Sequence, residues 1–224
     1  MTLRNPVYAA LTGPHATFAE SRGNTRCYPS SIAPFLALPD NPTAQDWSDA
    51  ADLLGTGTVA ALMRPDLPIP DTFKLDRQFD IVQYVAPPTL AAVDDEAVVL
   101  TPDDVPDMLA LVALTDPGPF RSRTIELGTY LGIRRDGELI AMAGTRFALP
   151  DHIEISAVCT HPSYRGQGLA SRLIRAVAAH IASTGRTPFL HTGGTNIRAI
   201  QLYESLGFTL SHQMKVTIVE PVQR

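Results

Sequence analysis

The second half of the chain reads Glu154-Ile-Ser-Ala-Val-Cys-Thr-His-Pro-Ser-Tyr-Arg-Gly-Gln-Gly-Leu-Ala-Ser171. The pattern predicts a buried strand, a glycine-containing turn and the start of a helix, in that order. Gly166 and Gly168 let backbone N–H groups approach a ligand without an intervening Cβ. The helix that follows adds unsatisfied N-terminal donors and the positive end of its dipole. The stretch therefore predicts an anion-binding site, and phosphate is the expected ligand.

The chain has 224 residues, of which 45% are apolar and 18% charged, enough to bury one large or two small cores. Its formal net charge is −5, so nucleic acid and anionic membranes are not expected partners. Cys27 and Cys159 lack metal-binding spacing, and no metal site is expected. No export signal or membrane span is visible. We therefore expect a cytoplasmic protein that is a monomer or a homodimer.

Residues 86–96 are rich in proline and then acidic, without periodicity, and they place a predicted domain boundary near residue 93. Residues 1–93 are expected to form a smaller N-terminal α/β unit without a recognisable motif. Its predicted elements are a helix at 44–54 and strands at 57–63 and 79–85.

Residues 94–224 are expected to form the second unit. Asp136-Gly137 lies between two strand-like segments and is typical of a type I′ hairpin turn. After the glycine turn, apolar residues four apart predict an amphipathic helix. Other elements are expected as helices at 102–114 and 196–206 and strands at 152–160, 187–192 and from 208 onward. The predicted fold class is α/β (α+β), with a mixed, mainly antiparallel central sheet flanked by helices.

Three kinds of anion site compete for the turn Arg165-Gly-Gln-Gly-Leu-Ala170. A Walker P-loop requires Gly-Lys-Ser/Thr, and Leu169 follows Gly168 here, which excludes it. A dinucleotide site requires an acidic residue about 20 positions on, and residues 186–192 offer none. The third interpretation is a pyrophosphate site of the coenzyme A kind, since a bound anion would offset the unfavourable position of Arg165 near a helix N-terminus.

The turn resembles the central Gln/Arg-x-x-Gly-x-Gly/Ala motif of the GNAT superfamily of acyl-CoA-dependent N-acetyltransferases, matched by Arg165, Gly168 and Ala170. A second segment, residues 196–208, is similar to that family's Asn-x-x-Ala-x-x-Leu-Tyr-x-x-x-Gly-Phe motif. The resemblance covers roughly residues 97–219. It implies a two-unit member of the family in which the C-terminal half is catalytic and the N-terminal half shapes or covers the acceptor site.

The resemblance implies acetyl-CoA as the cofactor. Backbone groups of Val158 and Thr160 would pair with the pantetheine arm, and N–H groups from 165 to 170 would hold the pyrophosphate. Cys159 lies between the two strand positions, where a small buried hydrophobe is expected rather than a nucleophile. The expected cofactor-binding residues are Val158, Cys159, Thr160, Arg165, Gly166, Gln167, Gly168, Leu169, Ala170, Ser171, Asn196, Ala199 and Tyr203.

The resemblance also implies direct transfer of the acetyl group to a primary amine of a small molecule, amino acid or peptide. Tyr203 would donate a proton to the departing thiolate. Because an ammonium has no lone pair, a base is needed, and Glu154 is the best carboxylate candidate. His152, His191 and water remain open as alternatives. The acceptor is expected beside residues 120–128; the alternative function is a catalytically silent acyl-CoA sensor or partner-binding module.

Overall fold

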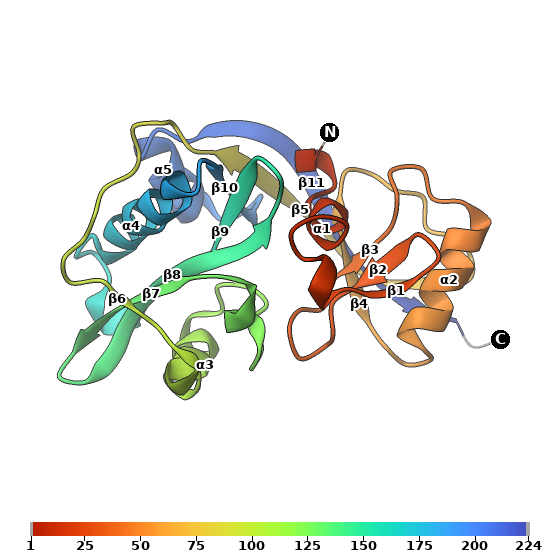
Figure 1. The fold of residues 1–224 in the computed structure, drawn as a ribbon, viewed down its shortest axis with the longest axis horizontal. Coiled ribbons are helices and arrows are strands. Elements are labelled where there is room, and N and C mark those ends of the chain that lie inside the picture. Colours follow the sequence, from red (N-terminus) through yellow and green to blue (C-terminus); the bar gives the residue numbers. More distant parts are fainter. Residues whose placement is uncertain (1, 223–224) are drawn as a thin grey trace.

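A computed structural model describes residues 2–222 of the chain and contains two sheets (Figure 1). The strands of the large sheet are β4 (Ala60–Arg64), β5 (Phe73–Val85), β6 (Val98–Val99), β7 (Tyr130–Arg135), β8 (Glu138–Ala148), β9 (His152–Thr160), β10 (Thr187–Gly193) and β11 (Thr209–Pro221). Their order across the sheet is β4-β11-β5-β10-β9-β8-β7-β6. A small sheet contains β1 (Glu20–Arg22), β2 (Thr25–Cys27) and β3 (Leu36–Ala37).

Both faces of the large sheet are covered by helices. These are α1 (Pro6–Leu11), α2 (Ala44–Leu54), α3 (Val105–Thr115), α4 (Leu169–Ser183) and α5 (Ile197–Ser205). The apolar stripe of α4 packs with Ile155 of β9 and with Tyr203 of α5 on one face. On the other face, α3 packs with Cys159 of β9, and α1 packs with Phe189 of β10. Figure 1 shows α2 beside the small sheet, at the end of the molecule away from α4.

The fold class predicted from the sequence is confirmed. Only β9 and β10 pair in parallel, and the other neighbouring strands of the described large sheet are antiparallel. The predicted hairpin between β7 and β8 is also confirmed, because Asp136 and Gly137 both have positive φ values, 51° and 85°, as a type I′ turn requires. Across residues 2–222, no helix is both long enough and apolar enough to cross a lipid bilayer.

Strand β5 lies between β10 and β11, although it precedes both by about a hundred residues in the chain. Tyr84 is in register with Leu190 of β10 on one side and with Leu210 of β11 on the other. Strand β4 continues the sheet beyond β11. The predicted boundary near residue 93 therefore falls between strands of one continuous sheet, and the division of the chain into two units stays a prediction.

We expect a fragment of residues 94–224 to be unstable, because without β5 the strands β10 and β11 have no partner between them. Its circular dichroism and its cooperative thermal transition should both be weaker than those of the full chain. Co-expression with residues 1–93 is the control and should restore them. A fragment that unfolds cooperatively at the temperature of the full chain would contradict this expectation.

Candidate active site

Strands β9 and β10 separate partway along their length. Their register ends at Ile155 and Leu190, while β9 continues to Thr160. A β-bulge lies at this point, because two steps along β8, from Met142 to Gly144, face three along β9. Ala157 occupies the bulge with a φ of 51°, a left-handed conformation uncommon for a residue with a side chain. The backbone of β9 beyond the bulge is therefore open on the side of β10.

The turn after β9 is built to hold an anion. Gly166 and Gly168 have φ values of 79° and 76°, and a Cβ at either would meet no atom within 4 Å. Gly168 is the N-cap of α4 and provides no side-chain cap, so the first-turn N–H groups of this 15-residue helix are left for a ligand. Thr160, at the end of β9, has a buried hydroxyl without a hydrogen-bond partner among the described residues. These features fit a coenzyme whose anionic and amide groups need donors and acceptors.

The predicted cofactor-binding residues lie on both sides of this opening. Val158 of β9 packs in the same apolar cluster as Ala199 and Tyr203 of α5, on the face of the sheet that α4 covers. The side chain of Cys159 points to the opposite face, into the cluster of α3, and burial raises the pKa of its thiol to about 11. A nucleophilic role for Cys159 is therefore disfavoured, as expected. In the turn, Arg165, Gly166, Gln167 and Gly168 are exposed, Leu169 is buried, and Ala170 and Ser171 are half-buried.

The second motif positions α5. The Asn196 side chain accepts the N–H of Ala199 at 3.2 Å, which makes it the N-cap of the helix; its cofactor contact stays a prediction. Tyr203 is 7% exposed, and its ring lies 6.4 Å from that of Tyr84. Burial raises the pKa of Tyr203 to about 12, so its phenol keeps its proton at neutral pH.

Glu154 is enclosed by three N–H donors. Arg146 donates to both carboxylate oxygens, from Nε at 2.7 Å and from Nη2 at 2.8 Å, and His191 Nδ1 lies 2.7 Å from Oε1. The carboxylate is 1% exposed. Burial alone would raise the pKa of Glu154, but Arg146 and His191 outweigh it and lower this pKa to about 2. Its predicted role as base stays a prediction, and its geometry is that of a carboxylate that positions its neighbours.

Gln83 of β5 continues this network. Its Nε2 donates to the carbonyl oxygen of Leu3 at 2.8 Å and lies 2.9 Å from His191 Nε2. Because an amide nitrogen only donates, His191 Nε2 accepts, and the ring proton is on Nδ1, which donates to Glu154. His212 Nδ1 lies 3.0 Å from Gln83 Oε1. His152, the other histidine considered as a base, is at the opposite end of β9, where the strands are still paired.

Sequence reasoning missed Arg146 and Gln83. Arg146 is 7% exposed, and its guanidinium lies 5.1 Å from the ring centroid of Phe35 and 4.6 Å from that of Phe147. The sequence did contain a sign of this role: Arg146 lies in an otherwise apolar strand, and a charged residue in such a strand is rarely buried without a partner of opposite charge. Gln83 gave a signal too, because the alternation of β5 places it on the same side as the buried Ile81, but its partners Leu3 and His191 are far away in the chain.

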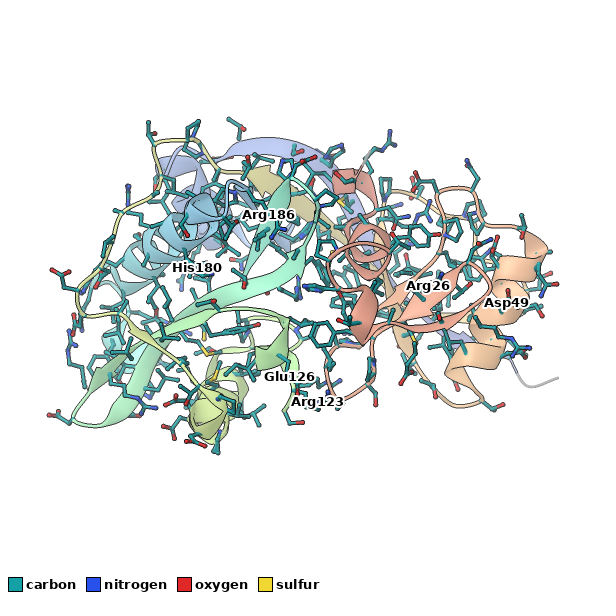
Figure 2. All side chains as sticks on the ribbon, in the orientation of Figure 1. Arg26, Asp49, Arg123, Glu126, His180 and Arg186 are labelled. Atoms are coloured by element: carbon teal, nitrogen blue, oxygen red, sulfur yellow. The ribbon has the colours of Figure 1, made fainter. Side chains whose placement is uncertain are left out.

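The loop expected to border the acceptor contacts the N-terminal residues. It contains the 3₁₀-helix η4 (Thr124–Leu127), where the hydroxyl of Thr124 donates to the Ile32 carbonyl and the N–H of Arg123 donates to the Ser31 carbonyl at 3.1 Å. Arg123 and Glu126 form an exposed, bidentate ion pair with two bonds of 2.7 Å. Figure 2 shows this pair side by side at the lower edge of the molecule, so both charges are already partnered.

The sequence and fold of this chain are similar to those of known proteins. Residues 130–216 match the family model described as FR47-like protein. A GNAT-family acetyltransferase from Novosphingobium aromaticivorans is 37% identical over the full length of both chains, with a TM-score of 0.91. A Drosophila protein has a TM-score of 0.63 at 18% identity, over 91% of this chain and 78% of its own. No curated protein matches the chain.

The chain belongs to the GNAT family of acetyltransferases, because a relative of this identity covers its whole length. The family implies an acyl-CoA as the acyl donor. The residues that fit this donor are those of the opening between β9 and β10 and of the turn before α4.

We expect Gly168→Ala to weaken binding of acetyl-CoA roughly tenfold, because the added Cβ would occupy open space next to the first turn of α4, where the anion is expected. Gly185→Ala is the matched control: Gly185, just after α4, has the same φ of 76° and equally open surroundings. Both variants should lose about 1 kcal/mol of stability through backbone strain. Calorimetric titration should show weakened binding in Gly168→Ala alone; equal affinities would contradict the assignment.

The buried carboxylate predicts a pH-dependent stability. Since the pKa of Glu154 is lowered to about 2 in the folded protein, ionised Glu154 stabilises the fold above pH 4.5, and this contribution is lost as the pH falls toward 2. Glu154→Gln should therefore reduce the free energy of unfolding by about 3 kcal/mol at pH 7 and by much less at pH 3. Denaturant titrations at both pH values measure this, and a loss independent of pH would refute it.

Proposed function

We propose that the protein is an N-acetyltransferase that moves an acetyl group from acetyl-CoA to a primary amine of a small molecule, amino acid or peptide by direct attack. The observation that carries this proposal is the opening between β9 and β10 at the Ala157 bulge, next to the uncapped N-terminus of α4. Bound acetyl-CoA would supply the activated thioester. Val158, Thr160 and the N–H groups of 165–170 would hold it, and Tyr203 and His191 lie on opposite faces of the opening.

The base in this proposal is His191. Glu154 accepts its Nδ1–H and so fixes the tautomer in which Nε2 carries the lone pair. In the resting arrangement that lone pair accepts from Gln83. An amine that delivers its proton to His191 would therefore take the place of the Gln83 amide. Glu154 positions the histidine and stabilises the imidazolium that forms, which a carboxylate already held by Arg146 does without taking the proton itself.

The acid in this proposal is Tyr203. Its phenol is protonated at neutral pH, and its hydroxyl makes no hydrogen bond to the part of the chain that the structure describes. The burial that raises the pKa of Tyr203 also disfavours a thiolate at the same place, so proton donation from phenol to departing sulfur remains favourable in a desolvated site.

Incubation of the protein with acetyl-CoA and a panel of amines, followed by measurement of free thiol, tests the function. We expect amine-dependent thiol release, reduced about 10²-fold in kcat by Tyr203→Phe with unchanged affinity for acetyl-CoA. Tyr84→Phe is the control: its hydroxyl, 2.9 Å from Glu204, belongs to the neighbouring ring but to no step of the reaction. Tight acetyl-CoA binding without thiol release from any amine would instead favour a silent acyl-CoA sensor.

A further inference from the structure

Tyr130 opens β7, directly after the loop that borders the expected acceptor site. It is in register with Gly144 of β8, which is in register with Ser156 of β9, one residue before the bulge. Tyr130 packs in one cluster with Ala157 of the bulge and with Phe120, whose ring centroid lies 5.5 Å from its own. Tyr130 therefore lies two strands from the opening, on the face covered by α3.

The backbone at Gly144 is shaped around this tyrosine. Its φ is outside the left-handed region, so the conformation itself does not require glycine. A Cβ at Gly144 would lie only 2.2 Å from Cδ1 and 2.6 Å from Cε1 of Tyr130. Glycine at this position thus lets the ring lie flat over β8, where any larger residue would displace it.

The hydroxyl of Tyr130 is buried and has no hydrogen-bond partner among the described residues. Such a group costs free energy in a folded protein, and an unpaired O–H donor is rarer than an unpaired acceptor. Tyr28 provides a contrast in a neighbouring apolar cluster: it is 3% exposed, and its hydroxyl lies 2.8 Å from His15 Nδ1. The fold therefore provides a hydrogen-bond partner for the phenol of Tyr28 and none for that of Tyr130.

Both phenols lie in the field of the buried ion pair. Burial raises the pKa of Tyr130, Arg146 opposes that rise, and Glu154 adds to it. Tyr130 therefore stays protonated and presents an O–H donor on the face that holds Glu154 and His191. Its other neighbours in the cluster are apolar or, like Met142 and Cys159, carry only sulfur, which is a weak hydrogen-bond acceptor.

We propose that the hydroxyl of Tyr130 donates a hydrogen bond to an oxygen atom of the acceptor, so that amines with a neighbouring carbonyl are favoured over plain alkylamines. This inference rests on the proposed amine acetylation. It selects within the predicted acceptors those that resemble amino acids and peptides. The apolar cluster around the phenol makes the bond selective, because an acceptor without this oxygen leaves the O–H unpaired.

Glycinamide and isobutylamine test the proposal, because they share the same branching of non-hydrogen atoms, and the carbonyl oxygen and amide nitrogen of the first are methyl groups in the second. We expect Tyr130→Phe to lower kcat/KM for glycinamide roughly tenfold and to leave that for isobutylamine unchanged. Its affinity for acetyl-CoA should equal that of the wild type. An unchanged ratio of the two kcat/KM values would overturn the proposal.

Thermal stability provides a readout that does not depend on catalysis. Tyr130→Phe removes an unsatisfied donor, so its Tm should be no lower than that of the wild type. Tyr28→Phe, the matched control, should melt about 2–4 °C lower because it breaks a formed hydrogen bond. An equal drop in both variants would show that the Tyr130 hydroxyl has a structural partner such as water, and would overturn the inference. If the wild type binds acetyl-CoA but acetylates no amine of the panel, the proposed function fails. The Tm comparison then still shows whether the Tyr130 hydroxyl is unpaired.

Discussion

The hydrogen bonding between β9 and β10 stops at Ile155 and Leu190, and the site depends on this interruption. A continuous parallel pair would satisfy its own backbone and leave nothing for a ligand. The bulge at Ala157 inserts one residue into β9 and turns its last residues away from β10. The cost is a left-handed alanine and an open edge inside the sheet, both of which a bound extended ligand can compensate.

An interruption in the middle of a sheet weakens it, and the surrounding strands hold it together. Glu154 and His191 join β9 to β10 just before they separate, while Arg146 ties the same carboxylate to β8. Gln83 extends the connection to β5, which is itself paired with both β10 and β11. Most of the network is buried, so its members stabilise the arrangement only while they remain paired.

The local elements of the C-terminal half could be predicted from sequence because their signals are local. The Asp136-Gly137 turn, the spacing of apolar residues in α4 and the glycines before it each determine the structure within a few residues. The position of β5 in the sheet could not be predicted, because its partner strands are about a hundred residues away in the chain. Its alternating pattern fits any half-buried strand. The partners of Glu154 were missed for the same reason: Arg146 and His191 meet it only through strand register.

The alternation of side chains in β9 and β10 explains why the proposed acid and base are separated. Glu154 is in register with Phe189, which packs against α1, whereas Ile155 and Leu190 face α4 and α5. Tyr203 therefore approaches the opening from the helix α5 side, and His191 approaches it from the side covered by the N-terminal residues. Two groups that must exchange protons with different atoms, the departing sulfur and the attacking nitrogen, are kept apart by the sheet itself. In the proposed reaction this separation would give the first 93 residues a direct part, because Gln83 and Leu3 complete the face on which the amine would arrive.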